Sequence, residues 1–161
     1  MTYQQPAVPP TPPYQQGGPT PLWAPLYGAS LVDAIRRFFS KYADFSGRAS
    51  RSEYWWWVLV DFVVGIVFSI LGGVLGFAGS STSDGATALG PGFVVVGILG
   101  TLWGLVTVVP HLALIWRRLH DANFAGPWWF LSFVPFGSLV VLVFTVLPSN
   151  PLGSRFDRPH A

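Results

Sequence analysis

The sequence predicts an all-α integral membrane protein with three transmembrane helices, a short interfacial amphipathic helix before them, and a disordered Pro/Gln-rich N-terminal tail. Three observations support this fold class. Hydrophobic residues make up 51% of the 161 residues and charged residues only 10%, whereas an ordinary soluble domain carries about 25% charged residues. Long apolar stretches follow one another along the chain, and the basic residues are grouped at their edges. A water-exposed globular surface is therefore excluded.

The composition also excludes several functional classes. The absence of cysteine removes disulfides, thiolate catalysis and cysteine-based zinc sites. His111, His120 and His160 are not spaced as a metal site. The net charge of +2 is too small to indicate a nucleic-acid partner. We therefore expect no metal, no cofactor and no nucleic acid. The N-terminus lacks the regions of a cleavable signal peptide, so the first span is expected to act as its own insertion signal.

Residues 1–29 are predicted to be a disordered tail. They hold eight of the fifteen prolines and no charged side chain. Such a composition cannot bury enough apolar surface to offset the loss of chain entropy. The alternative is a docking peptide, because three proline pairs (6 and 9, 9 and 12, 10 and 13) have PxxP spacing.

Residues 30–43 are expected to form the amphipathic helix that begins the membrane domain, residues 30–158. The apolar face holds Leu31, Val32, Ile35, Phe38, Phe39 and Tyr42, and the polar face holds Asp33, Arg36, Arg37, Ser40 and Lys41. The segment is too short and too charged to cross a bilayer, and a basic face opposite an aromatic one suits a helix lying among lipid headgroups. The alternative is a helix packed on the rest of the protein.

The first transmembrane helix is predicted over residues 55–78. Ser50 and Glu53 have capping-box spacing directly before it, and three successive tryptophans at its start are typical of the aromatic belt of a membrane interface. About 24 residues are enough to cross a hydrocarbon core of about 30 Å. The small pair Gly72 and Gly76 is expected to let another helix approach closely.

Two further spans are predicted, over residues 93–116 and 128–147. A loop without lysine or arginine, residues 79–92, precedes the second span. A polar C-terminal tail, residues 148–161, follows the third. The connection between the second and third spans, residues 117–127, is strongly charged and therefore lies outside the hydrocarbon.

The basic residues predict the orientation. With three spans, seven of them lie on one side, namely Arg36, Arg37, Lys41, Arg48, Arg51, Arg117 and Arg118. The positive-inside rule then places this side and the N-terminus in the cytoplasm. Arg155 and Arg158 fit this arrangement poorly. In the alternative, the third segment is re-entrant and turns at residues 135–137, which brings all nine basic residues to one side but requires protein cover for the turn.

Two motifs resemble a known family. Residues 45–55, Phe-Ser-Gly-Arg-Ala-Ser-Arg-Ser-Glu-Tyr-Trp, form the first. Pro110 and the Arg-Arg-Leu-His-Asp run at residues 117–121 follow, and Gly-Pro-Trp-Trp at residues 126–129 completes the pattern. Together they are similar to the bacterial "domain of unknown function 805" family of small inner-membrane proteins.

The resemblance covers about residues 31–158. It implies a bacterial plasma membrane and a fold of about three helices, and it implies no activity. The family's closing segment usually reads Asn-Arg-Tyr/Phe-Gly before a proline. Here Ser154-Arg155-Phe156-Asp157 departs from that pattern at its first and last positions.

Six residues are candidates for binding lipid or a protein partner: Arg48, Arg51, Arg117, Arg118, His120 and Asp121. Guanidinium groups bind phosphate in a bidentate way, and basic residues at a cytoplasmic boundary attract anionic headgroups by about 1 kcal/mol each. The simplest alternative makes Arg117 and Arg118 topology anchors. His120 and Asp121 would then mark a helix C-terminus, and as neighbours on a helix they point about 100° apart and form no catalytic dyad.

Two ionisable residues are expected inside the spans. Asp61 and His111 lie at about the same depth on antiparallel helices, and intramembrane ionisable groups rarely lack a partner. We expect them to face each other, or Asp61 to reach Arg117 or Arg118, unless Asp61 is hydrated at the interface. Pro110 is expected to kink the second span and to free a carbonyl group.

The sequence favours a multi-pass plasma-membrane protein that is not an enzyme and that binds anionic lipid or a protein partner through a basic cytoplasmic face. The alternative is a small transporter or channel lined by Asp61 and His111. Because three spans leave little internal cavity, transport would require a homo-oligomer. A lipid-acting enzyme using His120 and the arginines is the third hypothesis.

Overall fold

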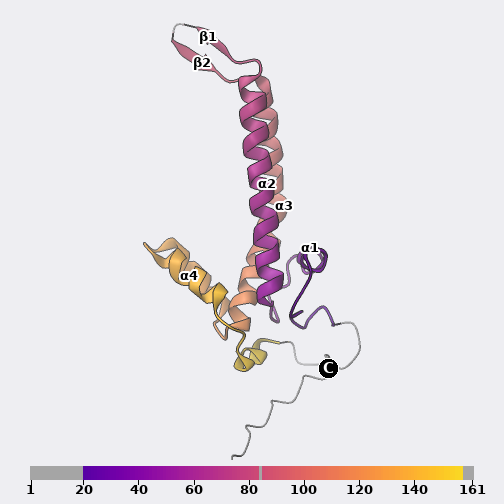
Figure 1. Cartoon of the computed structure of the whole chain (residues 1–161). Helices are drawn as coiled ribbons and strands as arrows, with labels where there is room; N and C mark the ends of the chain where they lie inside the picture. The colour runs from indigo at the N-terminus through magenta and orange to yellow at the C-terminus, as the bar shows by residue number, and fades with distance from the viewer. Residues whose placement is uncertain (1–19, 84, 158–161) are drawn as a thin grey trace, which may run out of the picture.

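The computed structural model describes residues 20–83 and 85–157, and most of them are helical. The elements are α1 (Leu31–Ser40), α2 (Arg51–Phe77), β1 (Ser81–Ser83), β2 (Ala86–Ala88), α3 (Pro91–Asp121), η2 (Gly126–Phe133), α4 (Gly137–Val146) and η3 (Pro151–Phe156). Helices α2 and α3 form a long antiparallel rod, with the β1–β2 hairpin at one end (Figure 1). The remaining elements gather around the other end.

Helices α2 and α3 are candidate membrane spans. They contain 27 and 31 residues, which at about 1.5 Å per residue is roughly 40 Å and 46 Å. A hydrocarbon core is about 30 Å thick, so both are long enough to cross it. Most of their apolar side chains are exposed, and the buried ones, such as Trp57 and Leu114, lie mainly toward the end of the rod opposite the β-hairpin. The predicted spans at 55–78 and 93–116 therefore correspond to these two helices, which are a few residues longer than expected.

Small residues bring the two helices together near the β-hairpin. Gly72 and Gly76 are buried, and a Cβ added to Gly76 would lie 3.2 Å from the Cβ of Phe93 on α3. At Gly92 an added Cβ would approach the Cβ of Leu75 to 2.6 Å. The predicted close approach at Gly72 and Gly76 is thus present, and Gly92 supplies it from the opposite helix.

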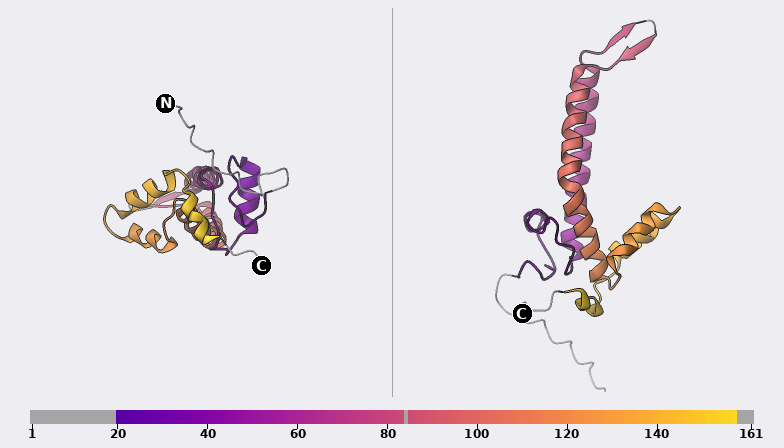
Figure 2. Two further views of the ribbon diagram at one scale, coloured as in Figure 1. Left: turned by 90° about the horizontal axis from the view of Figure 1, so that it is seen from below. Right: turned by 180° about the vertical axis from the view of Figure 1, so that it is seen from behind.

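The predicted third span at residues 128–147 is wrong. The segment instead forms η2 and α4, which lie side by side and diverge from the rod at its lower end (Figures 1 and 2). These helices contain 8 and 10 residues, far fewer than the roughly 20 that a transmembrane helix needs. The chain reverses at residues 135–137, where the re-entrant alternative placed its turn, and residues 126–147 are called the re-entrant hairpin for this reversal.

Local backbone geometry explains the turn. Phe136 adopts a left-handed conformation with φ 64°, which reverses the chain between η2 and α4. The next residue must be glycine, because a Cβ at Gly137 would overlap the carbonyl oxygen of Leu131. Both ends of the re-entrant hairpin lie near the end of α3. Phe124 stacks on Phe144 with their ring centroids 4.0 Å apart.

The described part of the predicted disordered tail is ordered, which corrects the prediction for residues 20–29. The backbone amide of Leu26 donates to Glu53 Oε2 at 3.2 Å, and that of Ala29 donates to Ser52 Oγ at 2.9 Å. These contacts fasten the segment to the start of α2. Residues 1–19, which contain the PxxP pairs, lie outside the described residues.

Helix α1 packs on the protein through one face and exposes the other. Ser30 and Asp33 close a capping box at its start. The Phe38 ring stacks on Trp57 of α2 with a centroid distance of 3.3 Å. Val32 on the opposite face is 71% exposed. Arg37, expected on the polar face, is buried against the protein.

Pro110 lies within α3 and frees a carbonyl, as expected. Because proline has no backbone N–H, the carbonyl of Val106 lacks its usual helical donor. The Tyr42 hydroxyl, just after α1, donates to this oxygen at 2.7 Å. The bond ties α1 to the interior of α3 at the one carbonyl that proline leaves open.

Candidate functional site

The six candidate residues all lie at one end of the rod. This basic end consists of residues 20–50, the start of α2, the end of α3, and residues 147–157 (Figure 1). Helix α3 continues to Asp121, so the Arg-Arg-Leu-His-Asp run is its last turn and not a loop. Of the six, only Arg51 is exposed, whereas Arg48, Arg117, Arg118, His120 and Asp121 are buried.

Arg118 and Asp121 form a fully buried ion pair. Arg118 Nη1 lies 2.6 Å from Asp121 Oδ2, and neither side chain is exposed. The Arg118 Nε also donates to the carbonyl of Thr145 at 2.9 Å, and its Nη2 donates to the carbonyl of Leu147. One guanidinium therefore satisfies the last carbonyls of α4 and holds the end of the re-entrant hairpin against α3.

The Asp121 carboxylate also binds two hydroxyls from distant segments. Tyr27 Oη donates to Oδ1 at 3.1 Å, and Ser149 Oγ donates to Oδ2 at 2.5 Å. Partial burial, reinforced by the negative charge of Asp121, raises the pKa of Tyr27 to about 12. Tyr27 thus remains a neutral donor. The carboxylate joins the N-terminal segment, α3 and the C-terminal segment.

A second set of contacts fastens the C-terminal segment. Arg48 donates to both carboxylate oxygens of Asp157, at distances from 2.7 to 3.2 Å. The His120 ring stacks on Phe156 with a centroid distance of 4.1 Å, and its Nδ1 lies 3.0 Å from the carbonyl oxygen of Gly47. Asp157 stands where the family pattern has glycine, and it supplies the anion that pairs with Arg48.

A third group of charges lies between α1 and α2. Arg37 pairs with Glu53 at 3.2 Å and donates to the carbonyl of Ala24 at 2.8 Å. Lys41 is 4% exposed, and burial lowers its pKa to about 8, although nearby Glu53 acts to raise it. Arg117 Nε donates to the Ala113 carbonyl at 3.1 Å, and its buried Nη2 has no hydrogen-bond partner among the described residues.

This geometry changes the meaning of the predicted arginine cluster. Arg117 and Arg118 are only 1% and 0% exposed, so their guanidinium groups cannot receive a lipid phosphate at the surface. His120 and Asp121 are held by internal partners and are likewise closed to a ligand. The structure brings the predicted residues together, but their contacts hold segments of the chain against one another. Arg51 is the accessible residue among the six candidates.

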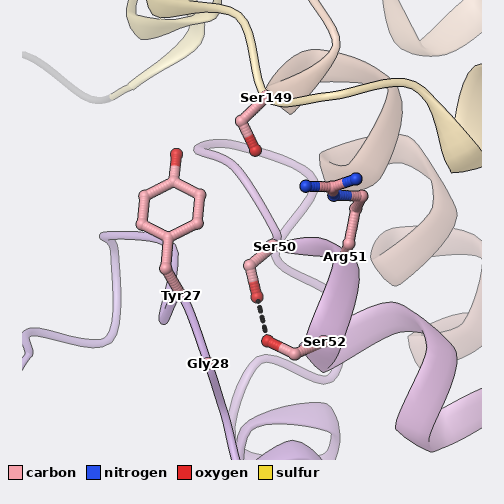
Figure 3. A pocket seen from close by; sticks show the side chains of 6 residues that line it. All are labelled: Tyr27, Gly28, Ser50, Arg51, Ser52 and Ser149. Carbon is pink, nitrogen blue, oxygen red and sulfur yellow. Dashed lines mark hydrogen bonds between the residues drawn. The ribbon is translucent and has the colours of Figure 1, made fainter.

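Arg51 lines an open pocket of about 250 Å³. The pocket lies where α2 begins, and its lining residues are Tyr27, Gly28, Ser50, Arg51, Ser52 and Ser149. Figure 3 shows the hydroxyls of Tyr27 and Ser149 and the Arg51 guanidinium around a common opening. No hydrogen bond or ion pair is found for the Arg51 guanidinium within residues 20–83 and 85–157. It is therefore available to an external anion.

The two intramembrane ionisable residues lie within electrostatic reach of each other. The hydrogen bond of Asp61, however, comes from Trp103 Nε1 at 3.0 Å. Arg117 and Arg118 point to other partners, so the expected contact of Asp61 with either arginine is wrong. Trp103 was missed because an indole is apolar in composition, although its N–H is a hydrogen-bond donor.

Sequence reasoning also missed Tyr27, Ser149 and Asp157. Tyr27 lies in the segment predicted to be disordered, and the other two lie in the tail that was considered only polar. Their partners are distant in the chain, so no local pattern marks them. Glu53 was recognised as a cap, but its pairing with Arg37 was not.

The fold and this charge network define a small helical membrane protein with two candidate spans and its buried ion pairs gathered at one end. Comparison with known proteins gives the particular family. The chain belongs to the family "Protein of unknown function (DUF805)", which it matches over residues 42–158.

Two relatives extend this result. The chain is 31% identical to "Inner membrane protein YhaH" of Escherichia coli K12 over 126 residues, which cover 78% of this chain and 93% of the relative. It is 39% identical to "Inner membrane protein YhaI" of the same strain over 116 residues, which cover 71% of this chain and 84% of the relative. No solved structure matches significantly. The chain is thus an inner-membrane protein of the bacterial type.

Proposed function

We propose that this protein is a non-enzymatic membrane module whose basic end binds anionic lipid headgroups on the cytoplasmic face. One observation carries the proposal. The exposed arginines of the described chain, Arg36, Arg51 and Arg155, all lie at the basic end and none lies near the β-hairpin. Each such residue near an anionic surface contributes about 1 kcal/mol of attraction.

The two-span topology supports the cytoplasmic orientation. With two spans and a re-entrant hairpin, every basic residue in the described chain falls on one side of the membrane. The positive-inside rule assigns such a side to the cytoplasm. The three-span alternative would have placed Arg155 on the opposite side.

Helix α1 supports the same proposal. Leu31, Val32 and Phe39 remain 39%, 71% and 40% exposed after the helix has packed on α2. Arg36 is exposed on the same helix. An exposed apolar face beside a cation suits the headgroup region, where the apolar side chains enter the acyl boundary. The interfacial placement and the packing on protein are therefore compatible.

Lipid retention tests the proposal. The purified protein is exchanged into nanodiscs or detergent containing phosphatidylglycerol or phosphatidylcholine with identical chains, and bound lipid is counted by native mass spectrometry. We expect selective retention of phosphatidylglycerol, which falls when Arg36, Arg51 and Arg155 are all replaced by Gln. Replacing the same residues by Lys keeps the charge and should preserve most of the selectivity. Equal retention of both lipids by the unaltered protein would reject the proposal.

A second candidate function is transport by a homo-oligomer. The electrostatic proximity of Asp61 and His111 favours it, as does the open pocket of about 170 Å³ that His111 shares with Trp129. Ion flux into proteoliposomes that disappears with Asp61→Asn would support transport. An unchanged flux with Asp61→Asn would leave this pair as an internal polar contact of the two spans.

A further inference from the structure

We infer that the pocket at Arg51 and an apolar groove beside it form one binding site for a single anionic phospholipid. The phosphate would occupy the pocket at Arg51, and an acyl chain would follow the groove along α2. The inference rests on the proposed function and deepens it, because it replaces a diffuse basic surface with a defined site.

The half of the site at Arg51 has the size and the charge for a phosphate headgroup. Its volume of about 250 Å³ is below the range of about 300–1,000 Å³ that is usual for drug-sized ligands. Arg51 contributes an exposed guanidinium, and guanidinium binds phosphate oxygens in a bidentate way. The hydroxyls of Tyr27 and Ser149 lie beside it in Figure 3, but they donate to Asp121, so Arg51 is the donor that the pocket offers to an anion.

The charges around the pocket leave a net positive centre. Asp121 is adjacent to the lining residues Tyr27 and Ser149, but its carboxylate is fully buried and paired with Arg118. Arg48, also nearby, is paired with Asp157. Within each ion pair the two charges cancel. The exposed guanidinium of Arg51 therefore determines the sign of the charge at the pocket. An anion is therefore favoured over a cation or a neutral group.

The apolar half begins where the pocket ends. A groove of about 290 Å³ is lined by Ser52, Trp55, Trp56 and Leu59. Ser52 lines both the pocket and the groove. Trp55, Trp56 and Leu59 are 36%, 39% and 45% exposed on a helix that continues into the candidate span. Their contiguous exposed surface suits an acyl chain, and tryptophan is favoured at this depth of a bilayer.

This arrangement favours a phospholipid over free phosphate. A soluble phosphate ion would fill only the pocket and would leave the groove unused. A phospholipid presents a phosphate and an apolar chain joined at the membrane interface, the same order in which α2 presents Arg51 and the tryptophans. The occupant we assign is therefore an anionic phospholipid.

The test compares single substitutions in the full-length protein. Binding of phosphatidylglycerol is measured by native mass spectrometry for Arg51→Gln, with Arg36→Gln as the matched control that removes one exposed cation elsewhere on the basic end. We expect Arg51→Gln to weaken binding of one lipid about fivefold to tenfold. Arg36→Gln should weaken it by a clearly smaller factor, because Arg36 lines neither the pocket nor the groove. Arg51→Lys should recover part of the affinity.

The groove and the ligand source require two further arms. Leu59→Ala should weaken binding of a long-chain phosphatidylglycerol but leave a short-chain analogue unaffected. Inorganic phosphate at millimolar concentration should not displace the lipid. Displacement by phosphate, together with no effect of Leu59→Ala, would overturn the phospholipid site in favour of a free-anion site. Thermal unfolding of each variant verifies that it is folded.

The outcomes separate this site from the proposed function. Equal losses with Arg51→Gln and Arg36→Gln would overturn the defined site while leaving a diffuse anionic-lipid surface intact. Retention without preference for phosphatidylglycerol in the unaltered protein would overturn both. A loss confined to Arg51→Gln and Leu59→Ala would support the site.

Discussion

The two ends of the α2–α3 rod are built on different principles. Toward the β-hairpin, side chains such as Ile70, Val74, Phe77 and Ile98 are 55–71% exposed, and the helices touch through small residues. At the basic end, charged side chains that sequence reasoning would place in water are buried in ion pairs. The far half has little protein around it and depends on lipid for its apolar contacts. The basic end carries most of the protein's own long-range bonds.

This difference assigns separate roles to the two regions. The far half of the rod belongs to the two candidate spans, and in a membrane its outward residues need only be apolar. The basic end determines how the re-entrant hairpin, α1 and the C-terminal segment are arranged around the rod. Substitutions should therefore be costly at buried charges and nearly neutral on the outward apolar faces.

The largest effect is expected at Arg118. Arg118→Ala would leave Asp121 buried without its cation and would release the carbonyls of Thr145 and Leu147. Removing one partner of a buried pair typically costs about 3–5 kcal/mol of stability. Thermal unfolding in a fixed detergent should show a large loss. The double variant Arg118→Met/Asp121→Leu should lose less stability than the sum of the losses in Arg118→Met and Asp121→Leu. Additive losses would show that the pair is not coupled.

A pH-dependent effect is expected at Lys41. Its pKa is lowered from 10.5 to about 8 in the folded protein, so between these values the unfolded chain binds more protons than the folded one. Stability from this residue should therefore rise with pH from about 8 to 10.5, by at most about 3 kcal/mol. Lys41→Met should remove this rise. A rise of the same size in Lys41→Met would assign it to other groups.

A smaller loss is expected where the two spans meet. Gly92→Ala places a methyl group against the Leu75 backbone and side chain, and overpacking typically costs about 1–3 kcal/mol. Gly97→Ala is the matched control, since an added Cβ there meets nothing within 4 Å. Equal melting temperatures for the two variants would contradict the close approach of α2 and α3.

The smallest effect is expected on the outward apolar face. Phe62 is 64% exposed, so Phe62→Ala removes few contacts within the protein. Its stability in detergent should remain within about 0.5 kcal/mol of the parent. A loss of several kcal/mol would place Phe62 in an interface between protein chains.

The sequence predicted the two spans because long apolar runs, capping residues and flanking tryptophans are local features. It failed at residues 128–147 because hydropathy does not distinguish a single span from two short helices. The turn depends on the left-handed Phe136 and on Gly137. The unfavourable position of Arg155 in the three-span topology was the one signal of the re-entrant alternative.

The location of the candidate residues was predicted correctly, but the burial of most of them in internal contacts was not. The motif residues Arg118 and Asp121 were placed at the correct end of α3. The sequence at a span edge does not show, however, whether an arginine faces water or protein. Their burial depends on Tyr27 and Ser149, which are 94 and 28 residues away from Asp121. Such long-range partners leave no periodic pattern in the sequence.

We expect the basic end to hold both ends of the re-entrant hairpin on one side of the membrane. The cysteine-free chain permits a direct measurement, in which single cysteines at Ser40, Thr82 and Leu152 are labelled with a membrane-impermeant maleimide in sealed vesicles of known orientation. We expect Ser40→Cys and Leu152→Cys to be labelled from the cytoplasmic side and Thr82→Cys from the opposite side. Labelling of Leu152→Cys together with Thr82→Cys would contradict it and restore a third span.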